Sequence, residues 1–240
     1  MRDQLKNELE LPIGFPLTEW KTALIPPETP MVGLWCRVEP IDPNRHAGSL
    51  FESFSKDSGN RIWTYLPYGP FETIGELTEW IRKTCLSSDP LFHVIIDTIS
   101  NKALGVASYL RITPNVGVIE VGHINYAPRL QKSRAGTEAM YLMMKRVFED
   151  LGYRRYEWKC DALNAASRSA AERLGMTFEG VFRQATIYKN RNRDTAWFSL
   201  LDVEWPQMKK AFELWLHPNN FSDDGSQINR LQDLKPNQCL

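Results

Sequence analysis

Hydrophobic and polar positions along the chain follow two periods, which together predict a mixed α/β domain built on a central sheet. Runs of β-branched and aromatic residues predict strands at residues 34–39, 92–96, 102–110, 116–126, 156–160, 178–182 and 195–201. Apolar spacing and capping residues predict helices over residues 43–54, 74–85, 136–150 and 165–174, and an amphipathic helix from residue 205. The three strands between residues 92 and 126 follow one another closely, so we expect an antiparallel meander.

Polar residues and glycines mark the ends of the predicted helices. Asp42 stands before a proline at a helix start, and Thr73 is followed three residues later by Glu76, which is a capping-box pattern. Gly152 is the expected carboxyl-terminal cap of the long helix, and Asn164 is the expected cap of the next one. Local hydrogen bonding is therefore expected to set these boundaries.

The chain divides into three parts. Residues 1–33 carry five prolines and predict an extended arm laid over the domain rather than a folding unit. Residues 34–205 contain all the predicted strands and form one domain. Residues 206–240 predict a C-terminal helix followed by a polar end that we expect to be disordered.

The composition is that of an ordinary globular protein. Among 240 residues, 29 Lys and Arg balance 29 Asp and Glu, so the formal net charge is zero. This balance argues against binding of nucleic acid or of an anionic membrane by bulk electrostatics. No run approaches the roughly 18 apolar residues of a membrane span, and the first residues lack the apolar stretch of a secretory signal. We therefore expect a cytoplasmic protein.

Cysteine usage agrees with that location. The four cysteines are scattered, with no C-x-x-C pair and no histidine at metal-ligand spacing: Cys36, Cys85, Cys160 and Cys239. We expect four reduced thiols and no metal site.

The most informative segment is the turn over residues 126–139, where the third strand of the meander leads into the long helix. Successive backbone N–H groups at a helix start, together with the helix dipole, bind phosphate. Arg129, Lys132 and Arg134 lie in the same turn and would strengthen an anion site. From the residues alone, a helix start with solvated basic side chains explains the pattern equally well.

This turn resembles the acyl-CoA pyrophosphate loop of the GNAT N-acetyltransferase superfamily, Gln/Arg-x-x-Gly-x-Gly/Ala. Gln131 and Gly136 occupy the first and last positions, but Arg134 replaces the middle glycine, so a side chain stands where the backbone normally approaches phosphate. The resemblance implies the GNAT fold, a mixed, mostly antiparallel sheet flanked by helices, and acetyl-CoA as acyl donor without a metal. It assigns cofactor binding to Ile124, Gln131, Lys132, Ser133, Arg134, Ala135, Gly136, Thr137, Asn164 and Ser167.

A second block strengthens the resemblance. Asn164 and Ser167, with Leu174 and Gly175 after them, are similar to the family's Asn-x-x-Ser helix and its Leu-Gly-Phe ending. In such enzymes the asparagine and serine face the pantetheine and phosphate of the cofactor, a role compatible with ordinary helix capping. The final strands resemble the ribosomal-protein-alanine acetyltransferase branch, and the likeness covers roughly residues 34–205.

Acetyl transfer to an amine needs a base, and the resemblance makes Glu120 the first candidate. Apolar neighbours would raise the pKa of a glutamate towards neutrality, although the solvent face of an alternating strand fits the sequence almost as well. His123, three residues later, lies on the opposite face of a regular strand unless a bulge intervenes. Such a bulge is common in the family, so His123 is the second candidate base. Backbone around residues 123–125 would contact the oxyanion.

The general acid is less clear from the sequence. Many relatives carry a tyrosine four residues before the glycine of the Leu-Gly-Phe ending, and Ala171 stands there instead. The absence of this tyrosine fits the ribosomal-protein-alanine branch. Tyr188 is a weaker substitute.

The acceptor side is an aromatic loop and a basic tip. The loop contains Trp63, Tyr65, Tyr68 and Phe71, which suit a pocket for an amine but equally suit core packing. Residues 189–193 form a basic hairpin tip, which in isolation fits a weak nucleic-acid or acidic-substrate patch but is more often a solvated turn.

The predicted activity is acetyl transfer from acetyl-CoA to a protein amino terminus or a small-molecule amine, with a homodimer as the frequent family assembly. The alternatives are a transferase that uses another donor such as succinyl-CoA, and a degenerate member that only binds or senses CoA.

Overall fold

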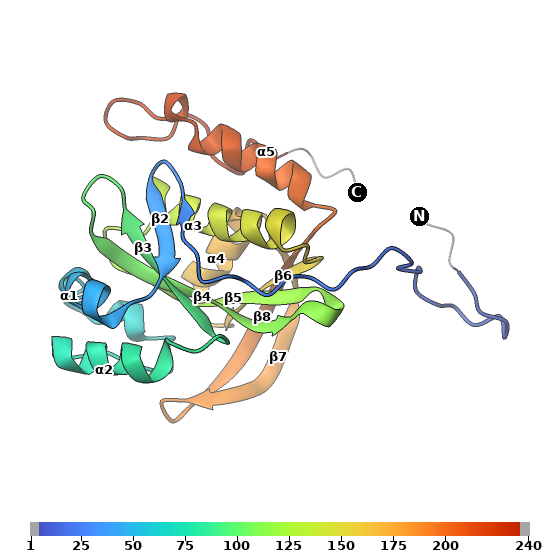
Figure 1. Ribbon diagram of the computed structural model, residues 1–240, viewed down its shortest axis with the longest axis horizontal. Coiled ribbons are helices and arrows are strands. Elements are labelled where there is room, and N and C mark those ends of the chain that lie inside the picture. Colours follow the sequence, from blue (N-terminus) through green and yellow to red (C-terminus); the bar gives the residue numbers. More distant parts are fainter. Residues whose placement is uncertain (1–4, 236–240) are drawn as a thin grey trace.

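The computed structural model describes residues 5–235 and places one eight-stranded sheet at the centre of the molecule (Figure 1). The strands are β1 Met31–Val32, β2 Cys36–Pro40, β3 Leu91–Asp97, β4 Ala103–Thr113, β5 Val118–Tyr126, β6 Arg155–Asp161, β7 Thr177–Tyr188 and β8 Arg191–Leu201. The helices are α1 Pro43–Phe54, α2 Ile74–Thr84, α3 Arg134–Lys145, α4 Ala165–Arg173 and α5 Trp205–Leu216.

The sheet has the order β1-β2-β3-β4-β5-β6-β8-β7. Every neighbouring pair is antiparallel except β5 and β6, which run parallel because α3 crosses between them. The predicted meander and the mixed, mostly antiparallel sheet are therefore confirmed.

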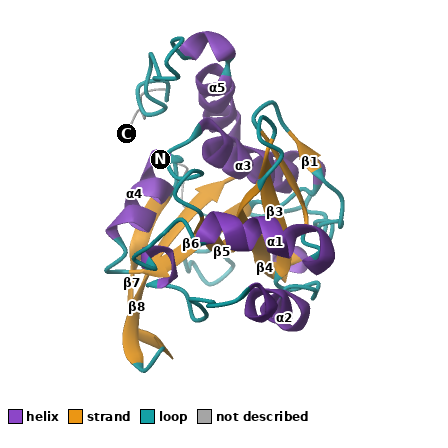
Figure 2. Cartoon of the chain, turned by 90° about the vertical axis from the view of Figure 1, so that its left-hand side faces the viewer, coloured by secondary structure: helices purple, strands orange, loops and turns teal. Residues whose placement is uncertain are grey.

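Helices cover both faces of the sheet, because alternate residues of a strand point to opposite sides. On β3, Phe92 and Val94 pack with α1 and α2, whereas Leu91 and Ile95 join the larger cluster under α3 and α5. Figure 2 shows α1 and α2 on one side of the strands and α3 and α5 on the other. The molecule thus has two hydrophobic cores separated by the sheet.

The predicted caps are present. The Asp42 carboxylate accepts from two N–H groups in the first turn of α1, and Asn164 accepts from the Ser167 N–H at the start of α4. Thr73 Oγ1 accepts from the Glu76 N–H, while the Glu76 carboxylate bonds to the N–H of Glu72, one residue earlier than the usual capping box requires.

The long helix begins earlier than its apolar spacing indicates. Ser133 caps α3 by accepting from the Gly136 N–H, so the helix starts at Arg134 and continues after Lys145 as a wider turn to Asp150. Glu138, which the sequence analysis did not single out, accepts the backbone N–H groups of residues 34–36 at 2.6–2.8 Å and ties α3 to β2.

The N-terminal arm follows the prediction in its second half only. The Trp20 indole donates to the carbonyl of Asn115, Ala23 is buried, and Met31 belongs to the core. Residues 5–19 extend away from the sheet in Figure 1, and their apolar side chains are exposed.

The expectation of a disordered polar end is wrong as far as residue 235. Leu231 is 1% exposed and joins the larger core. The Asn220 side chain, buried among polar backbone, bonds to the carbonyls of Trp215 and Asn229 and to the N–H of Asn229. A few such contacts hold a segment whose average composition is polar. Residues 236–240 lie outside the described part.

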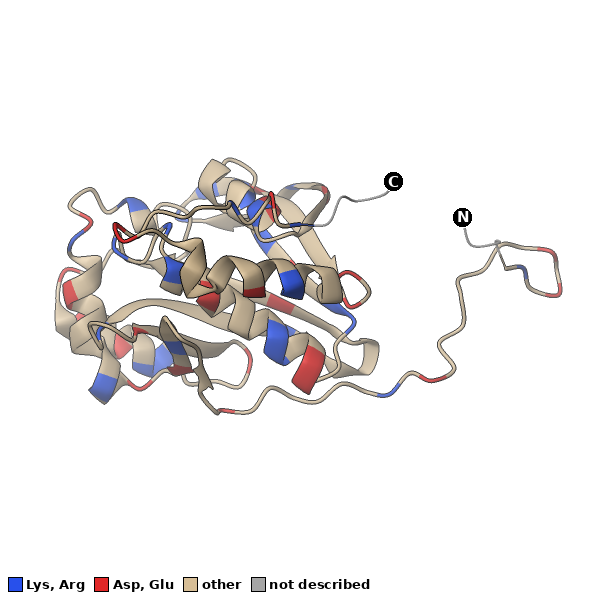
Figure 3. Cartoon of the chain, turned by 90° about the horizontal axis from the view of Figure 1, so that it is seen from above, with Lys and Arg blue, Asp and Glu red and all other residues tan. Residues whose placement is uncertain are grey.

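Figure 3 shows Lys and Arg positions interspersed with Asp and Glu positions along the ribbon, in line with the zero net charge. No helix within residues 5–235 has the length and apolar character needed to cross a bilayer.

Candidate active site

The parallel pairing between β5 and β6 is short, and a cleft opens where it ends. The pairs run from Val118 with Arg155 to Val121 with Trp158, after which β6 pairs only with β8. A cleft of about 2030 Å³ lies between the diverging strands and is also lined by α3, α4, the β7–β8 hairpin and the C-terminal segment. Strand edges without a partner leave N–H and C=O groups available to a ligand.

A bulge in β5 turns His123 into this cleft. Pairing with β4 shifts register between Val106 and Ser108, and His123 has a φ of 51°, which is the left-handed region. The predicted bulge is therefore present, and His123 and Glu120 line the same cleft despite their odd spacing.

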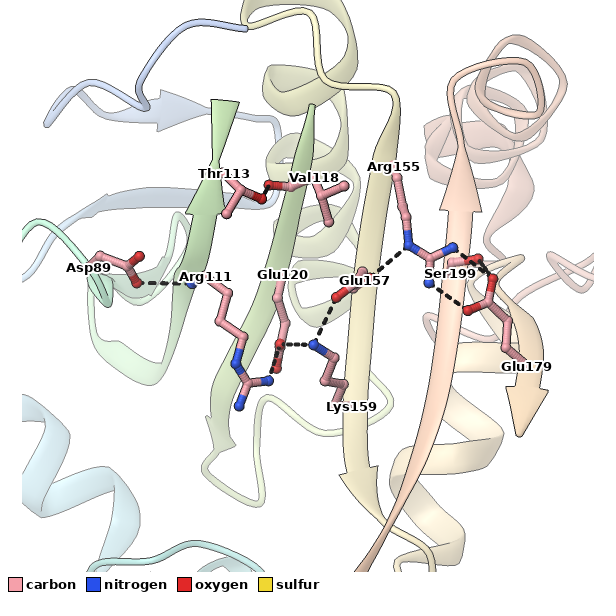
Figure 4. A network of polar contacts seen from close by, with 10 residues as sticks. All are labelled: Asp89, Arg111, Thr113, Val118, Glu120, Arg155, Glu157, Lys159, Glu179 and Ser199. Atoms are coloured by element: carbon pink, nitrogen blue, oxygen red, sulfur yellow. Dashed lines mark hydrogen bonds and ion pairs between the residues drawn. The ribbon is translucent and has the colours of Figure 1, made fainter. Parts of the chain in front are cut away.

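Glu120 does not have the apolar surroundings expected for it. Its side chain is buried, and its Oε2 lies 2.6 Å from Arg111 Nη1 and 2.8 Å from Lys159 Nζ (Figure 4). These two contacts hold the side chain in place between β4 and β6. Both cations contact the same oxygen, and in residues 5–235 no protein group bonds to Oε1. Glu120 thus presents a carboxylate with one oxygen available.

The contacts of Glu120 continue across the sheet as a row of alternating charges. Lys159 Nζ lies 2.8 Å from Glu157 Oε2, and Arg155 bonds to both Glu157 and Glu179 (Figure 4). Burial raises the pKa of Glu157, but its contacts with Lys159 and Arg155 outweigh that effect, so the pKa is lowered overall. The row fixes Glu120 at the point where β5 and β6 separate.

His123 is held neutral by its surroundings. Burial, and then the charges of Arg111 and Arg193, lower its pKa to about 4. Its Nδ1 lies 3.2 Å from the Tyr68 hydroxyl, and its ring packs 4.9 Å from that of Phe92. A neutral imidazole at the strand divergence can accept or relay a proton.

The start of α3 forms the other end of the cleft. The side chain of Gln131 donates to the carbonyl of Tyr126, which fixes the loop before the helix. Gly136 is required there because an added Cβ would lie 2.6 Å from the carbonyl oxygen of Leu130. The N–H groups of this first turn, together with Lys132, border the cleft.

The three basic residues of this turn separate in space. Arg134 stacks its guanidinium 4.1 Å above the ring centroid of Trp35 and 4.7 Å from that of Phe221. It lies outside the helix backbone and still borders the cleft, whereas Arg129 turns away to Asp97 at 3.7 Å. The expected cluster of three is thus reduced to Lys132 and Arg134.

The structure brings nearly all the predicted site residues together. Those that line the cleft are Glu120, His123, Ile124, Gln131, Lys132, Ser133, Arg134, Gly136, Thr137, Asn164 and Ser167. Ala135 differs because its side chain is buried in the core, so only its backbone could contribute. The Ser167 hydroxyl also accepts from the Trp158 indole at 2.9 Å.

Tyr188 does reach the cleft, but in a fixed position. Its hydroxyl donates to Asp161 Oδ2 at 2.8 Å. Burial and that carboxylate raise its pKa to about 12. Ala171, at the position where many relatives carry a tyrosine, is fully buried.

The aromatic loop divides between packing and the cleft. Trp63 is buried and packs on Phe54 and Phe71, whereas Tyr65 lines the cleft. Tyr68 contacts His123, as described above. The basic tip is attached to this loop, since Lys189 donates to the carbonyl of residue 63 and Arg191 to that of residue 64.

Several cleft residues were missed by sequence reasoning. They are Arg111, the side chain of Asn125, Lys159, Asp161 and Arg230, which come from β4, β5, β6 and the C-terminal segment. Lys159 lies within a strand and could have been found only with the register of β6, whereas Arg193, part of the predicted basic tip, lines the cleft from β8. Eight Lys and Arg but only two Asp and Glu line the cleft, so a neutral chain concentrates positive charge there. Among the described residues, no His, Cys, Asp and Glu group of three could hold a metal ion.

Comparison with known proteins gives one family. A family model described as "Acetyltransferase (GNAT) domain" matches residues 37–177. No curated protein matches the chain. The chain is 43% identical to a GCN5-related N-acetyltransferase from Brucella melitensis, with 91% of this chain and 99% of that one covered and a TM-score of 0.89.

Two further structures agree. A probable acetyltransferase of the GNAT family from Chromobacterium violaceum is 42% identical over 82% of this chain and 98% of that one, with a TM-score of 0.76. The microcin C7 self-immunity acetyltransferase MccE, solved with acetyl-CoA and AMP, is 20% identical over 74% of this chain and 98% of that one. Its TM-score of 0.63 shows a shared fold.

Proposed function

Because the chain belongs to the GNAT acetyltransferase family, we propose that it moves an acetyl group from acetyl-CoA directly to a primary amine. The acceptor is a small-molecule amine or a protein amino terminus, as in the ribosomal-protein-alanine branch. The observation that carries this proposal is the single cleft that joins the α3 start to Glu120 and His123 where β5 and β6 diverge.

Acetyl-CoA fits the cleft with its diphosphate at the start of α3. Ser133 already accepts the N–H groups of Gly136 and Thr137, so we place this anion at the N–H groups of residues 134 and 135. Lys132 and Arg134 add positive charge. Gln131 holds the loop, and Ile124, Asn164 and Ser167 border the path along which pantetheine would run to the acyl group.

The amine loses its proton to Glu120 in this proposal. Arg111 and Lys159 hold the carboxylate in place, and its Oε1 accepts the proton directly or through water. Neutral His123 is the second acceptor. Backbone N–H groups of residues 123–125 stabilise the oxyanion, and water or Tyr188 protonates the leaving thiolate.

The test is release of free thiol from acetyl-CoA with a panel of primary amines. Glu120→Gln should lower kcat/KM by about 10²–10⁴-fold with little change in the Kd of acetyl-CoA. Glu149→Gln, outside the cleft and paired with Lys209, is the matched control. If acetyl-CoA at millimolar concentration did not raise the Tm, the cofactor assignment itself would fail.

A second candidate function, binding or sensing of CoA without turnover, draws on the replacement of the usual tyrosine by Ala171 and of the motif glycine by Arg134. Tight binding of acetyl-CoA with no turnover on any amine would favour it. Parallel assays with succinyl-CoA test the donor. Light scattering and cell fractionation test the homodimer and the cytoplasmic location that we propose with this function.

A further inference from the structure

At the end of the cleft beyond Glu120, one cation has no carboxylate partner among the described residues. We call this region the acceptor end; it is formed by Arg111, Glu120, His123, Tyr188, Arg193 and Trp197. Lys159 is matched by Glu120 and Glu157, and Arg111 shares Glu120 with it. The remaining carboxylate, Asp161, accepts the Tyr188 hydroxyl.

Arg193 is the cation without a carboxylate partner. It is half-buried on β8, and among the described residues no carboxylate lies within 4.0 Å of its guanidinium nitrogens. Its Nε is buried and has no hydrogen-bond partner in the described chain. The positive charge of Arg193 helps to lower the pKa of His123, so Arg193 lies near the proposed reacting centre.

Further unsatisfied polar atoms belong to residues that line the cleft. The Trp197 indole N–H is buried without a partner in the described residues, as are both polar atoms of the Asn125 side chain, which is 2% exposed. Arg193 and Trp197 are four residues apart on β8 and line the cleft together. Buried polar groups are nearly always hydrogen-bonded, so these atoms indicate a polar ligand.

We propose that the acceptor amine carries an anionic group, a carboxylate or a phosphate, and that Arg193 binds it beside the N–H of Trp197. The proposal rests on the acetyltransferase function and narrows its substrate class. A guanidinium matches the paired oxygens of either anion, and a half-buried position strengthens that contact. The exposed Arg111 can add a second contact while it remains paired with Glu120.

The location of Arg193 distinguishes the proposed anion site of the acceptor from the site of the acetyl-CoA phosphates. Those phosphates are placed at the α3 start, with Lys132 and Arg134, whereas Arg193 is on the β7–β8 hairpin near His123. Loss of Arg193 should therefore change the acceptor's kinetics and leave the Kd of acetyl-CoA unaltered.

The experiment uses pairs of amines that differ in one anionic group, with saturating acetyl-CoA and the full-length protein. The carboxylate arm compares amino acids and acidic dipeptides with their amides, and the phosphate arm compares phosphoethanolamine with ethanolamine. We expect at least one anionic member to exceed its neutral partner about 10-fold or more in kcat/KM, and the arm in which this occurs identifies the anion.

Arg193→Gln should lower kcat/KM for that anionic amine by about 10- to 100-fold and change the neutral partner by less than about 2-fold. Arg193→Lys should recover part of the loss, because it restores the charge without the paired donors. Arg183→Gln is the matched control on the neighbouring strand β7, where the side chain is exposed and does not line the cleft.

Equal or better use of the neutral amine in every pair would overturn the proposal, as would a preference that survives Arg193→Gln. Absence of turnover on every anionic member while acetyl-CoA still binds also counts against it. A neutral amine acetylated in a Glu120-dependent manner would keep the acetyltransferase function and refute only the anionic acceptor. Failure of acetyl-CoA to bind would refute the function itself.

Discussion

Lys159→Met removes the central cation of the charge row that holds Glu120. Lys159 is 5% exposed at its side chain and contacts the carboxylates of Glu120 and Glu157, each at 2.8 Å. Those two glutamates are paired in register on neighbouring parallel strands. Methionine fills a similar volume without the charge, so the variant leaves two buried carboxylates facing each other.

The loss of unfolding free energy expected for Lys159→Met follows from these distances. At an effective dielectric constant of about 20, opposite unit charges 2.8 Å apart attract by about 6 kcal/mol, and Lys159 makes two such contacts. Desolvation of the ammonium offsets several kcal/mol of this. Removing one partner of a buried pair costs about 3–5 kcal/mol in the free energy of unfolding, or about 6–20 °C in Tm for a chain of this size.

Urea unfolding at pH 7 and the Kd of acetyl-CoA give the two readouts. Lys209→Met is the matched control, because Lys209 pairs with Glu149 while 32% exposed and should cost less than about 1 kcal/mol. Adding Glu157→Gln to the Lys159→Met variant should restore about 1–3 kcal/mol, since one of the two facing carboxylates is removed.

A free energy of unfolding within about 1 kcal/mol of the wild type for Lys159→Met would refute the reasoning. Further loss on adding Glu157→Gln would also refute it. Either result would mean that the row contributes nothing to holding Glu120, and the base would then have to be sought at His123.

Two further predictions concern pH and the C-terminal segment. Burial lowers the pKa of His93 from 6.5 to about 4, so between these pH values the folded state binds fewer protons than the unfolded state. The free energy of unfolding therefore decreases as pH falls through this window. His93→Leu should flatten the dependence of unfolding free energy on pH, measured by urea unfolding over pH 4–7, by up to about 3 kcal/mol, and an unchanged slope would contradict this. Phe221→Ala removes one of the two rings that contact Arg134 and should raise the Kd of acetyl-CoA, measured by calorimetry, about 2- to 30-fold. Phe178→Ala is the control: it removes a ring that contacts Arg168 outside the cleft, and it should leave the Kd of acetyl-CoA unchanged.

Element positions could be predicted wherever a residue's neighbours in sequence determine its environment. The strands over residues 92–126 alternate or are buried throughout, and helix caps such as Asp42 and Asn164 act within three residues. The β7–β8 hairpin was predicted too short. Its outer half is exposed on both faces, so no hydrophobic alternation marks it.

The candidate site could be predicted only where a motif is local. The α3 start and Asn164 are continuous segments, whereas the environment of Glu120 depends on which residues of β4 and β6 stand beside it. Arg111 reaches Glu120 from a β4 residue with a φ of 49°, an irregularity that no periodicity announces. The expectation of apolar surroundings for Glu120 was therefore wrong, although its position was not.

The C-terminal segment contacts Arg134, the residue that departs from the family motif. An arginine where the motif has a glycine would crowd a phosphate if its side chain turned inwards, but Trp35 and Phe221 hold it outside. Both rings lie beyond residues 37–177, which match the family model. Trp35 also donates to the carbonyl of Leu216 at the end of α5, so the tail, the residue before β2 and the α3 start form one unit. The departure from the motif is thus accommodated by chain outside the family's common core, and the two features should be retained or lost together.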